Sequence, residues 1–112
     1  MTIVLDGDHL TIHDVEAVAR GGREVSVSDE AWDRIRICRE MIQRKIDDHE
    51  VMYGVTTGIG EFSEVVLTPT QVKEFQKFLV YSHAAGIGGP MPIEVVRGGM
   101  LGRINVHCHG NS

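Results

Sequence analysis

The pattern of apolar and polar residues predicts a mainly α-helical chain with a small strand element near its N-terminus. Two short apolar runs, residues 3–5 and 10–12, lie on either side of Asp6-Gly7-Asp8, whose composition is typical of a tight turn. We therefore expect a β-hairpin over residues 3–12. Helices are expected farther along the chain at 12–20, 28–48, 69–85 and from about residue 92 onward.

Several of these helices have start signals in the sequence. Thr11 with Asp14, and Thr68 with Gln71, have the spacing of a capping box, in which each residue satisfies a free backbone N–H group of the other. Ser28 can cap the second helix by accepting a hydrogen bond from the first turn. Apolar residues at spacings of three and four then form one stripe along the second helix: Ala31, Ile35, Cys38, Ile42 and Ile46.

Glycines interrupt the last expected helix. Gly98, Gly99 and Gly102 each lower its intrinsic stability by about 1 kcal/mol relative to alanine. A glycine on a helix face allows another helix to pack close to the backbone, so we expect such an approach here, by a partner that is not obvious within this chain. The whole chain, residues 1–112, is interpreted as a single segment of a larger helical bundle.

Composition excludes some classes of function. The 112 residues contain 11 Lys and Arg against 16 Asp and Glu, a net charge of -5, which argues against nucleic acid or an acidic membrane surface as partner. No apolar run approaches the roughly 20 residues that span a bilayer, and the N-terminus lacks the pattern of a signal peptide. We therefore expect a cytoplasmic protein in which Cys38 and Cys108 are free thiols.

Two side chains are candidates for chemistry. Tyr53 opens a loop, residues 53–60, that contains three glycines and can present the phenol to a cleft as a general acid or base. The alternative is a packed aromatic residue. His83 shares the apolar face of the third helix with Phe75 and Leu79 and could bind or polarise a substrate. The alternative is a core histidine bonded to a backbone carbonyl.

Two other patterns resemble a phosphate-binding loop and a metal site, but each lacks a feature that such a site requires. The loop at residues 53–60 has no Lys-Ser/Thr ending, so it is not expected to be a phosphate-binding loop. His107-Cys108-His109 includes metal-ligand side chains, but adjacent residues on a helix point about 100° apart and cannot all converge on one ion. No metal site is expected.

Three motifs together resemble one known family. The stretch YGVTTGIG, from Tyr53 to Gly60, resembles the tyrosine-glycine loop of histidine, phenylalanine and tyrosine ammonia-lyases and related aminomutases. The stretch SHAAGIG, from Ser82 to Gly88, resembles their second motif, especially its form in histidine ammonia-lyases. Arg103-Ile104-Asn105, with Gly110 and Ser112, resembles a third segment. The order and spacing of the three motifs agree with the family.

The resemblance implies the N-terminal segment of the large helical aromatic amino acid lyase fold. It implies part of a histidine ammonia-lyase, an enzyme that deaminates L-histidine to trans-urocanate and ammonia. Members of this family are homotetramers that use the electrophile 4-methylideneimidazole-5-one (MIO), made from an internal Ala-Ser-Gly tripeptide, and no metal. By resemblance, Tyr53 is the catalytic base, and His83, Ser82 and Gly60 bind the substrate.

The chain departs from the family in one respect that bears on activity. Ala-Ser-Gly does not occur in the 112 residues, so the resemblance implies that the chain is inactive alone and needs the remainder of the lyase or other subunits. Two other interpretations remain. The chain is part of a tyrosine or phenylalanine ammonia-lyase or a 2,3-aminomutase, or it is a non-catalytic homologue that acts as a binding partner of a lyase.

Overall fold

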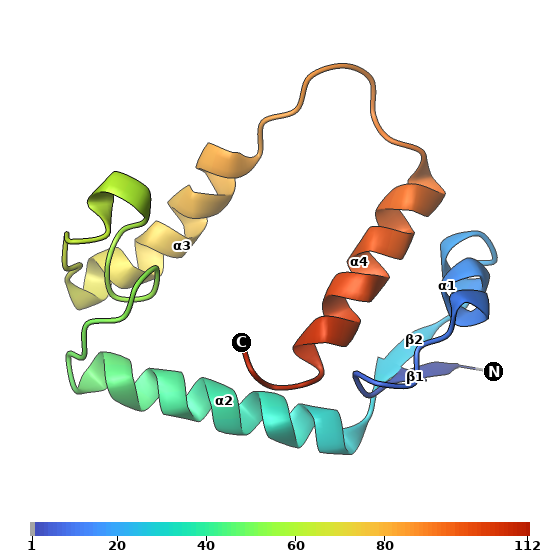
Figure 1. Cartoon of the computed structure of the whole chain (residues 1–112), viewed down its shortest axis with the longest axis horizontal. Coiled ribbons are helices and arrows are strands. Elements are labelled where there is room, and N and C mark those ends of the chain that lie inside the picture. Colours follow the sequence, from blue (N-terminus) through green and yellow to red (C-terminus); the bar gives the residue numbers. More distant parts are fainter. Residues whose placement is uncertain (1) are drawn as a thin grey trace. The chain divides into compact units, whose positions relative to one another are not determined.

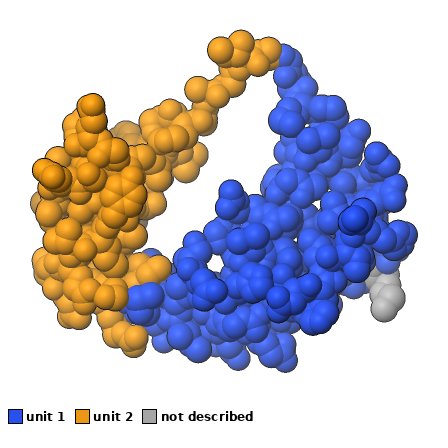
Figure 2. Space-filling model, in the orientation of Figure 1, with its two compact units in different colours: residues 1–41, 89–112 blue, residues 42–88 orange. Residues whose placement is uncertain are grey.

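The computed structural model describes residues 2–112 and confirms a mainly helical chain (Figure 1). Within these residues the elements are β1 (Ile3–Leu5), α1 (Ile12–Ala19), β2 (Val25–Val27), α2 (Asp29–Asp47), the 3₁₀ helix η1 (Gly60–Phe62), α3 (Pro69–His83) and α4 (Ile93–His107). The chain divides into two compact units, which are described separately (Figure 2). The first comprises residues 1–41 and 89–112, and the second comprises residues 42–88.

The helix starts follow the capping signals in the sequence. Thr11 with Asp14, and Thr68 with Gln71, form complete capping boxes at the first residues of α1 and α3. At the start of α2, the Ser28 hydroxyl accepts a hydrogen bond from the backbone N–H of Ala31 at 3.1 Å. Along α2, the expected apolar stripe includes the two buried residues of the helix, Ala31 and Cys38.

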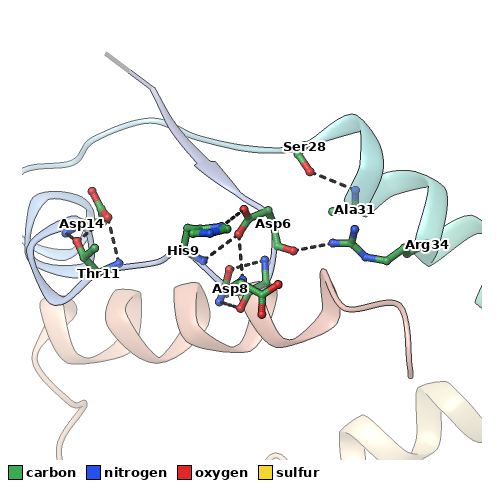
Figure 3. Close-up of polar contacts among 10 residues, drawn as sticks. Asp6, Asp8, His9, Thr11, Asp14, Ser28, Ala31 and Arg34 are labelled. Carbon is green, nitrogen blue, oxygen red and sulfur yellow. Dashed lines mark hydrogen bonds and ion pairs between the residues drawn. The ribbon is translucent and has the colours of Figure 1, made fainter.

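The expected β-hairpin over residues 3–12 is wrong. β1 pairs with β2 in parallel, with Ile3 opposite Val25 and Leu5 opposite Val27, and α1 forms the connection that a parallel pair requires. Asp6 redirects the chain after β1, because its carboxylate accepts hydrogen bonds from the backbone N–H groups of Asp8 and His9, both at 3.0 Å (Figure 3). The second apolar run therefore leads into α1 instead of returning as a strand.

The core of the first unit lies where β1, α2 and α4 meet. Its buried members are Leu5, Ala31, Leu101 and Cys108, and partly buried residues such as Val15 of α1 pack against them. α1 contacts α4, and a Cβ placed at Gly98 would lie 3.7 Å from Val15 Cγ1, which is an ordinary packing distance. Nothing described lies within 4 Å of a Cβ at Gly99 or Gly102, so residues 2–112 do not supply the close partner expected at these α4 glycines.

The third sequence motif fastens the end of α4 to the rest of the first unit. The Asn105 side chain holds Gly7 at two points: Oδ1 accepts from the Gly7 N–H at 3.1 Å, and Nδ2 donates to the Gly7 carbonyl at 2.8 Å. Arg34 of α2 donates from Nε to the Cys108 carbonyl at 3.1 Å and from Nη2 to the Asp6 carbonyl at 2.6 Å (Figure 3). These contacts join the two ends of the chain within one unit.

Both cysteines are buried free thiols. Cys38 Sγ donates to the Ser112 carbonyl and Cys108 Sγ donates to the Ile104 carbonyl, each at 3.4 Å. Burial raises the pKa of the Cys108 thiol, which favours its unreactive protonated form. Within residues 2–112, no helix is both long and apolar enough to cross a membrane.

Candidate functional site

The loop that begins at Tyr53 is organised by two buried threonines. Thr56 and Thr57 are only 5% and 1% exposed. Thr56 Oγ1 accepts a hydrogen bond from the Met52 N–H at 2.7 Å and donates to the Glu50 carbonyl at 2.8 Å. The Thr56 hydroxyl therefore connects Met52, the residue before Tyr53, to Glu50, which lies in the turn after α2. Thr56 and Thr57 are not among the expected site residues, although hydroxyl residues between glycines are a recognisable signal of such local bonding.

Thr57 holds the other side of the same loop. Its hydroxyl accepts from the Gly54 N–H at 3.3 Å and donates to the Gly58 carbonyl at 2.9 Å. Gly54 has a φ of 69°, in the left-handed region that favours glycine. At Gly58, an added Cβ would lie 2.6 Å from the Phe62 carbonyl oxygen, so this position has no room for a side chain. The geometry of the loop thus depends on its threonines and on its glycines.

A short return segment closes the loop. Thr57 and Val66 form an isolated antiparallel bridge. The Gly58 N–H donates to the Val65 carbonyl at 3.2 Å, and the Leu67 N–H donates to the Thr56 carbonyl at 2.8 Å. These backbone bonds make residues 53–67 an ordered structure, and a loop held in this way can present one side chain in one place.

Tyr53 and Gly60, two of the expected site residues, are brought together by this loop. The Gly60 N–H donates a long hydrogen bond of 3.4 Å to the Tyr53 phenol oxygen. Gly60 has a φ of 58°, which permits the turn that aims its N–H at the phenol. Tyr53 is 69% exposed among residues 2–112. The phenol is therefore both oriented and accessible.

Ser82 and His83, the other two expected residues, form a second polar group at the end of α3. His83 Nδ1 lies 2.9 Å from the Leu79 carbonyl oxygen and 3.0 Å from Ser82 Oγ. Ser82 Oγ also donates to the Leu79 carbonyl at 3.0 Å. The backbone-carbonyl contact expected of a structural histidine is thus present, but His83 is exposed and is not a core residue. The contact orients an accessible ring.

An apolar pocket of about 410 Å³ connects α3 with the loop inside the second unit. Phe75 and Leu79 share its wall with His83, which confirms the expected common face of α3, and Ile59 and Phe62 contribute from the loop. Its volume lies in the range of small-molecule sites. Tyr53 is not among the residues that line this pocket. Ile59, the residue before Gly60, lines the same pocket as Ser82 and His83.

The described residues do not supply a cofactor. The MIO group implied by the resemblance forms from Ala-Ser-Gly, and no such tripeptide occurs in the sequence. These residues therefore do not fit the role of forming that group. No cluster of three or more His, Cys, Asp or Glu side chains in residues 2–112 is arranged to hold a metal ion, and this includes His107-Cys108-His109.

Comparison with known proteins places the chain in a family. Residues 10–112 match the family model described as aromatic amino acid lyase. A histidine ammonia-lyase of Caldanaerobacter subterraneus subsp. tengcongensis is 44% identical over 110 residues, which cover 98% of this chain and 22% of that protein. The chain therefore belongs to the aromatic amino acid lyase family, and it spans about a fifth of the length of the curated relatives it matches.

Solved structures share the same fold segment. The crystal structure of histidine ammonia-lyase from Trypanosoma cruzi superposes with a TM-score of 0.87 at 35% identity, covering 98% of this chain and 21% of that one. The structure of tyrosine aminomutase from Streptomyces globisporus superposes with a TM-score of 0.92 at 30% identity, with the same coverage of 98% and 21%. The expected segment of the aromatic amino acid lyase fold is thereby confirmed.

Proposed function

We propose that this chain forms part of the active site of a histidine ammonia-lyase, which converts L-histidine to trans-urocanate and ammonia. Tyr53 is the catalytic base and His83 binds the side chain of the substrate. The observation that carries the proposal is the accessible Tyr53 phenol, oriented by the Gly60 N–H in a loop that two buried threonines close. The similarity to histidine ammonia-lyases at 40–44% identity supports the choice of substrate.

The proposed role of Tyr53 is a proton transfer. In its deprotonated form the phenol oxygen takes a proton from the β-carbon of the substrate. The electron pair of that C–H bond becomes the Cα=Cβ double bond, and the amino group leaves with the electrons of the Cα–N bond. The MIO group supplies the electrophile of this reaction in the family, and we expect it to come from residues outside these 112. The step that we assign to this chain is the removal of the β-proton by Tyr53.

The proposed roles of His83, Ser82 and Gly60 concern binding. His83 and Ser82 are the lining residues with polar side chains in the otherwise apolar pocket, where a substrate ring would contact the His83 imidazole. Ser82 lies next to that group. Gly60 lies at the phenol oxygen, and its backbone belongs to the loop that we expect near the substrate carboxylate.

Large apolar side chains that remain exposed support a need for further protein around this site. Phe62 is 68% exposed, Phe78 is 59% exposed and Tyr81 is 64% exposed. We propose that the remainder of the enzyme or other subunits of a homotetramer cover them, that residues 1–112 act as one segment of that enzyme, and that it works in the cytoplasm. The isolated chain is expected to produce no urocanate, because it lacks Ala-Ser-Gly.

A chimaera tests the proposal. Residues 1–112 replace the matching segment of the Caldanaerobacter histidine ammonia-lyase, which supplies the rest of the fold. We expect a soluble chimaera with the ultraviolet absorbance of the prosthetic group to release urocanate from L-histidine. A matured chimaera of the parent's oligomeric state that turns over no L-histidine would contradict the proposal and favour a non-catalytic homologue.

One observation favours a second candidate function. The tyrosine aminomutase of Streptomyces globisporus contains the same fold segment, with a TM-score of 0.92 at 30% identity. The same chimaera is therefore offered L-tyrosine and L-phenylalanine, with chromatography of the products. A kcat/KM for L-tyrosine above that for L-histidine would assign the segment to a tyrosine-specific lyase or aminomutase.

A further inference from the structure

We propose that Thr56 is a positioning residue for Tyr53: its buried hydroxyl fixes the backbone that leads into Tyr53, and this backbone sets the place of the phenol oxygen. Thr56 is not a lining residue of the apolar pocket, so it acts on the reaction only through Tyr53. The effect on catalysis rests on the proposed function, whereas the effect on the place of the phenol is a property of the loop and is measured without substrate.

The place of the Tyr53 phenol depends mainly on its backbone. The residue is 69% exposed, and the hydrogen bond that its oxygen accepts from the Gly60 N–H is long, at 3.4 Å. An exposed side chain makes few of the packing contacts that hold a buried one. The direction of the Cα–Cβ bond of Tyr53, which the backbone sets, therefore decides where the phenol oxygen lies.

Thr56 binds both backbone polar groups of Met52, the residue before Tyr53. Its Oγ1 accepts from the Met52 N–H at 2.7 Å, and its own backbone N–H donates to the Met52 carbonyl at 3.0 Å. These two bonds close a turn over residues 52–56, and Tyr53 lies inside that turn. Tyr53 thus follows directly on a residue whose N–H and carbonyl are both held by Thr56.

The rest of the second unit anchors Thr56 on two sides. Its hydroxyl donates to the Glu50 carbonyl at 2.8 Å, and the Glu50 N–H donates to the carbonyl of Lys45 in α2 at 2.9 Å. Its backbone carbonyl accepts from the N–H of Leu67 at 2.8 Å, and Leu67 lines the apolar pocket. Thr56 therefore connects the backbone before the phenol to α2 and to the return segment.

Burial makes the Thr56 hydroxyl hard to replace. The residue is only 5% exposed, so water has little access to its two partners. Valine has the shape of threonine, but it would leave the Met52 N–H and the Glu50 carbonyl without the group that binds them. The backbone at Met52 would then move to find other partners, and Tyr53 would move with it. Serine keeps the hydroxyl and should keep the turn.

Crystal structures of the chimaera without substrate measure the place of the phenol directly. We expect Thr56→Val to move the Tyr53 oxygen by about 1 Å or more from its place at the Gly60 N–H, a shift that is large for catalysis. Thr56→Ser should leave the oxygen in its original place. An unmoved phenol in a folded Thr56→Val chimaera would overturn the proposal.

A second variant guards against a valine that prevents folding. Thr56→Ala also removes the hydroxyl but adds no methyl group in its place, and we expect the same shift of the phenol. If neither hydroxyl-free variant folds while Thr56→Ser does, the hydroxyl is needed for the whole unit, and this result would also overturn a role that is specific to Tyr53.

Steady-state kinetics of the chimaera separate positioning from stability. Thr56→Val should lower kcat for L-histidine by about tenfold or more and leave KM within about twofold, because the base moves and the pocket does not. Thr56→Ser should recover kcat to within a few-fold. The matched control is Thr68→Ala, which removes the hydroxyl that caps α3 in the same unit and should lower stability without changing kcat.

Two kinetic results would refute the positioning role: an unchanged kcat in a matured Thr56→Val chimaera, or an equal loss of kcat in Thr68→Ala at a temperature where both are folded. The place of the phenol is measured without substrate. A folded chimaera that is inactive before any substitution would therefore refute the proposed function, and the crystal structures would still decide whether Thr56 positions Tyr53.

Discussion

The phenol oxygen of Tyr53 accepts a hydrogen bond from the backbone N–H of Gly60, seven residues farther along the same loop. The two residues belong to one sequence motif, and the structure shows why that motif contains both: the loop returns on itself, so that its last glycine orients its first side chain. The intervening threonines and glycines make this return possible.

Replacing the buried Thr57 with valine should destabilise the second unit. Valine keeps the volume, but it leaves the Gly54 N–H and the Gly58 carbonyl without their partner. We expect a loss of about 1–3 kcal/mol in the free energy of unfolding, measured with urea. Thr70→Val, at an exposed position of α3, is the control and should change stability by less than about 0.5 kcal/mol. Equal effects of the two substitutions would contradict the role given to Thr57.

Two glycines of the first unit should respond to alanine in opposite directions. Gly110 has a φ of 70°, and a Cβ there would lie 2.7 Å from the Arg34 carbonyl carbon, so Gly110→Ala should lower the free energy of unfolding by more than about 1 kcal/mol. Gly99 lies inside α4 with nothing described within 4 Å, so Gly99→Ala should raise it by up to about 1 kcal/mol. A stabilising Gly110→Ala would show that the turn after α4 does not lie against α2 as described.

The contact between Asp6 and His9 should depend on pH. The His9 ring holds the pKa of the Asp6 carboxyl well below its ordinary 3.8, with help from two backbone N–H groups, and the Asp6 carboxylate raises the pKa of His9 above 6.5. The carboxylate's contribution to stability is full above about pH 3.8 and is lost as pH falls through its lowered pKa. The histidine's contribution is full below about pH 6.5 and is lost as pH rises through its raised pKa.

The measurement is a magnetic resonance titration of His9 in the wild type and in Asp6→Asn. Asparagine keeps an oxygen that can accept from the Asp8 and His9 N–H groups, so the turn should persist while the charge is removed. We expect the pKa of His9 to fall toward 6.5 in the variant. An unchanged titration would show that the Asp6 carboxylate does not act on this ring.

His83→Leu should reduce the activity of the chimaera toward L-histidine. Leucine keeps an apolar side chain at the pocket wall and removes the ring nitrogens that we propose contact the substrate ring. We expect kcat/KM to fall by at least about tenfold, which is roughly 1.4 kcal/mol of transition-state binding. An unchanged kcat/KM would make His83 a structural residue, held only for its bond to Leu79.

Sequence alone predicted the helices well because their signals are local. The two capping boxes and the stripe of α2 depend on residues three or four positions apart, and such signals survive without knowledge of the rest of the fold. The strand pairing was mispredicted, because the choice between a hairpin and a parallel partner depends on Val25–Val27, about twenty residues away. The turn chemistry at Asp6 is the same in both cases, so it could not distinguish them.

In the candidate site, too, the features that depend on neighbouring residues could be predicted, and those that depend on distant residues could not. Tyr53 and His83 could be selected from the glycine loop and the helix face, and their motifs pointed to the family. The burial of Thr56 and Thr57 and the approach of the Phe62 carbonyl to Gly58 could not be predicted, because they depend on the return segment at residues 65–67. The Nδ1 contact of His83 depends on the rotamer of one ring at a helix end, which no residue pattern specifies.

The most direct test of the account is the kcat of the chimaera for L-histidine with Tyr53→Phe. Phenylalanine keeps the ring and deletes only the oxygen that accepts from Gly60, so the fold and the matured prosthetic group should be retained, as shown by melting temperature and ultraviolet absorbance. If Tyr53 removes the β-proton, kcat should fall by about a hundredfold or more, the usual scale for loss of a general base. A fully matured Tyr53→Phe chimaera whose kcat stays within a few-fold of the unsubstituted chimaera would contradict the catalytic role of Tyr53.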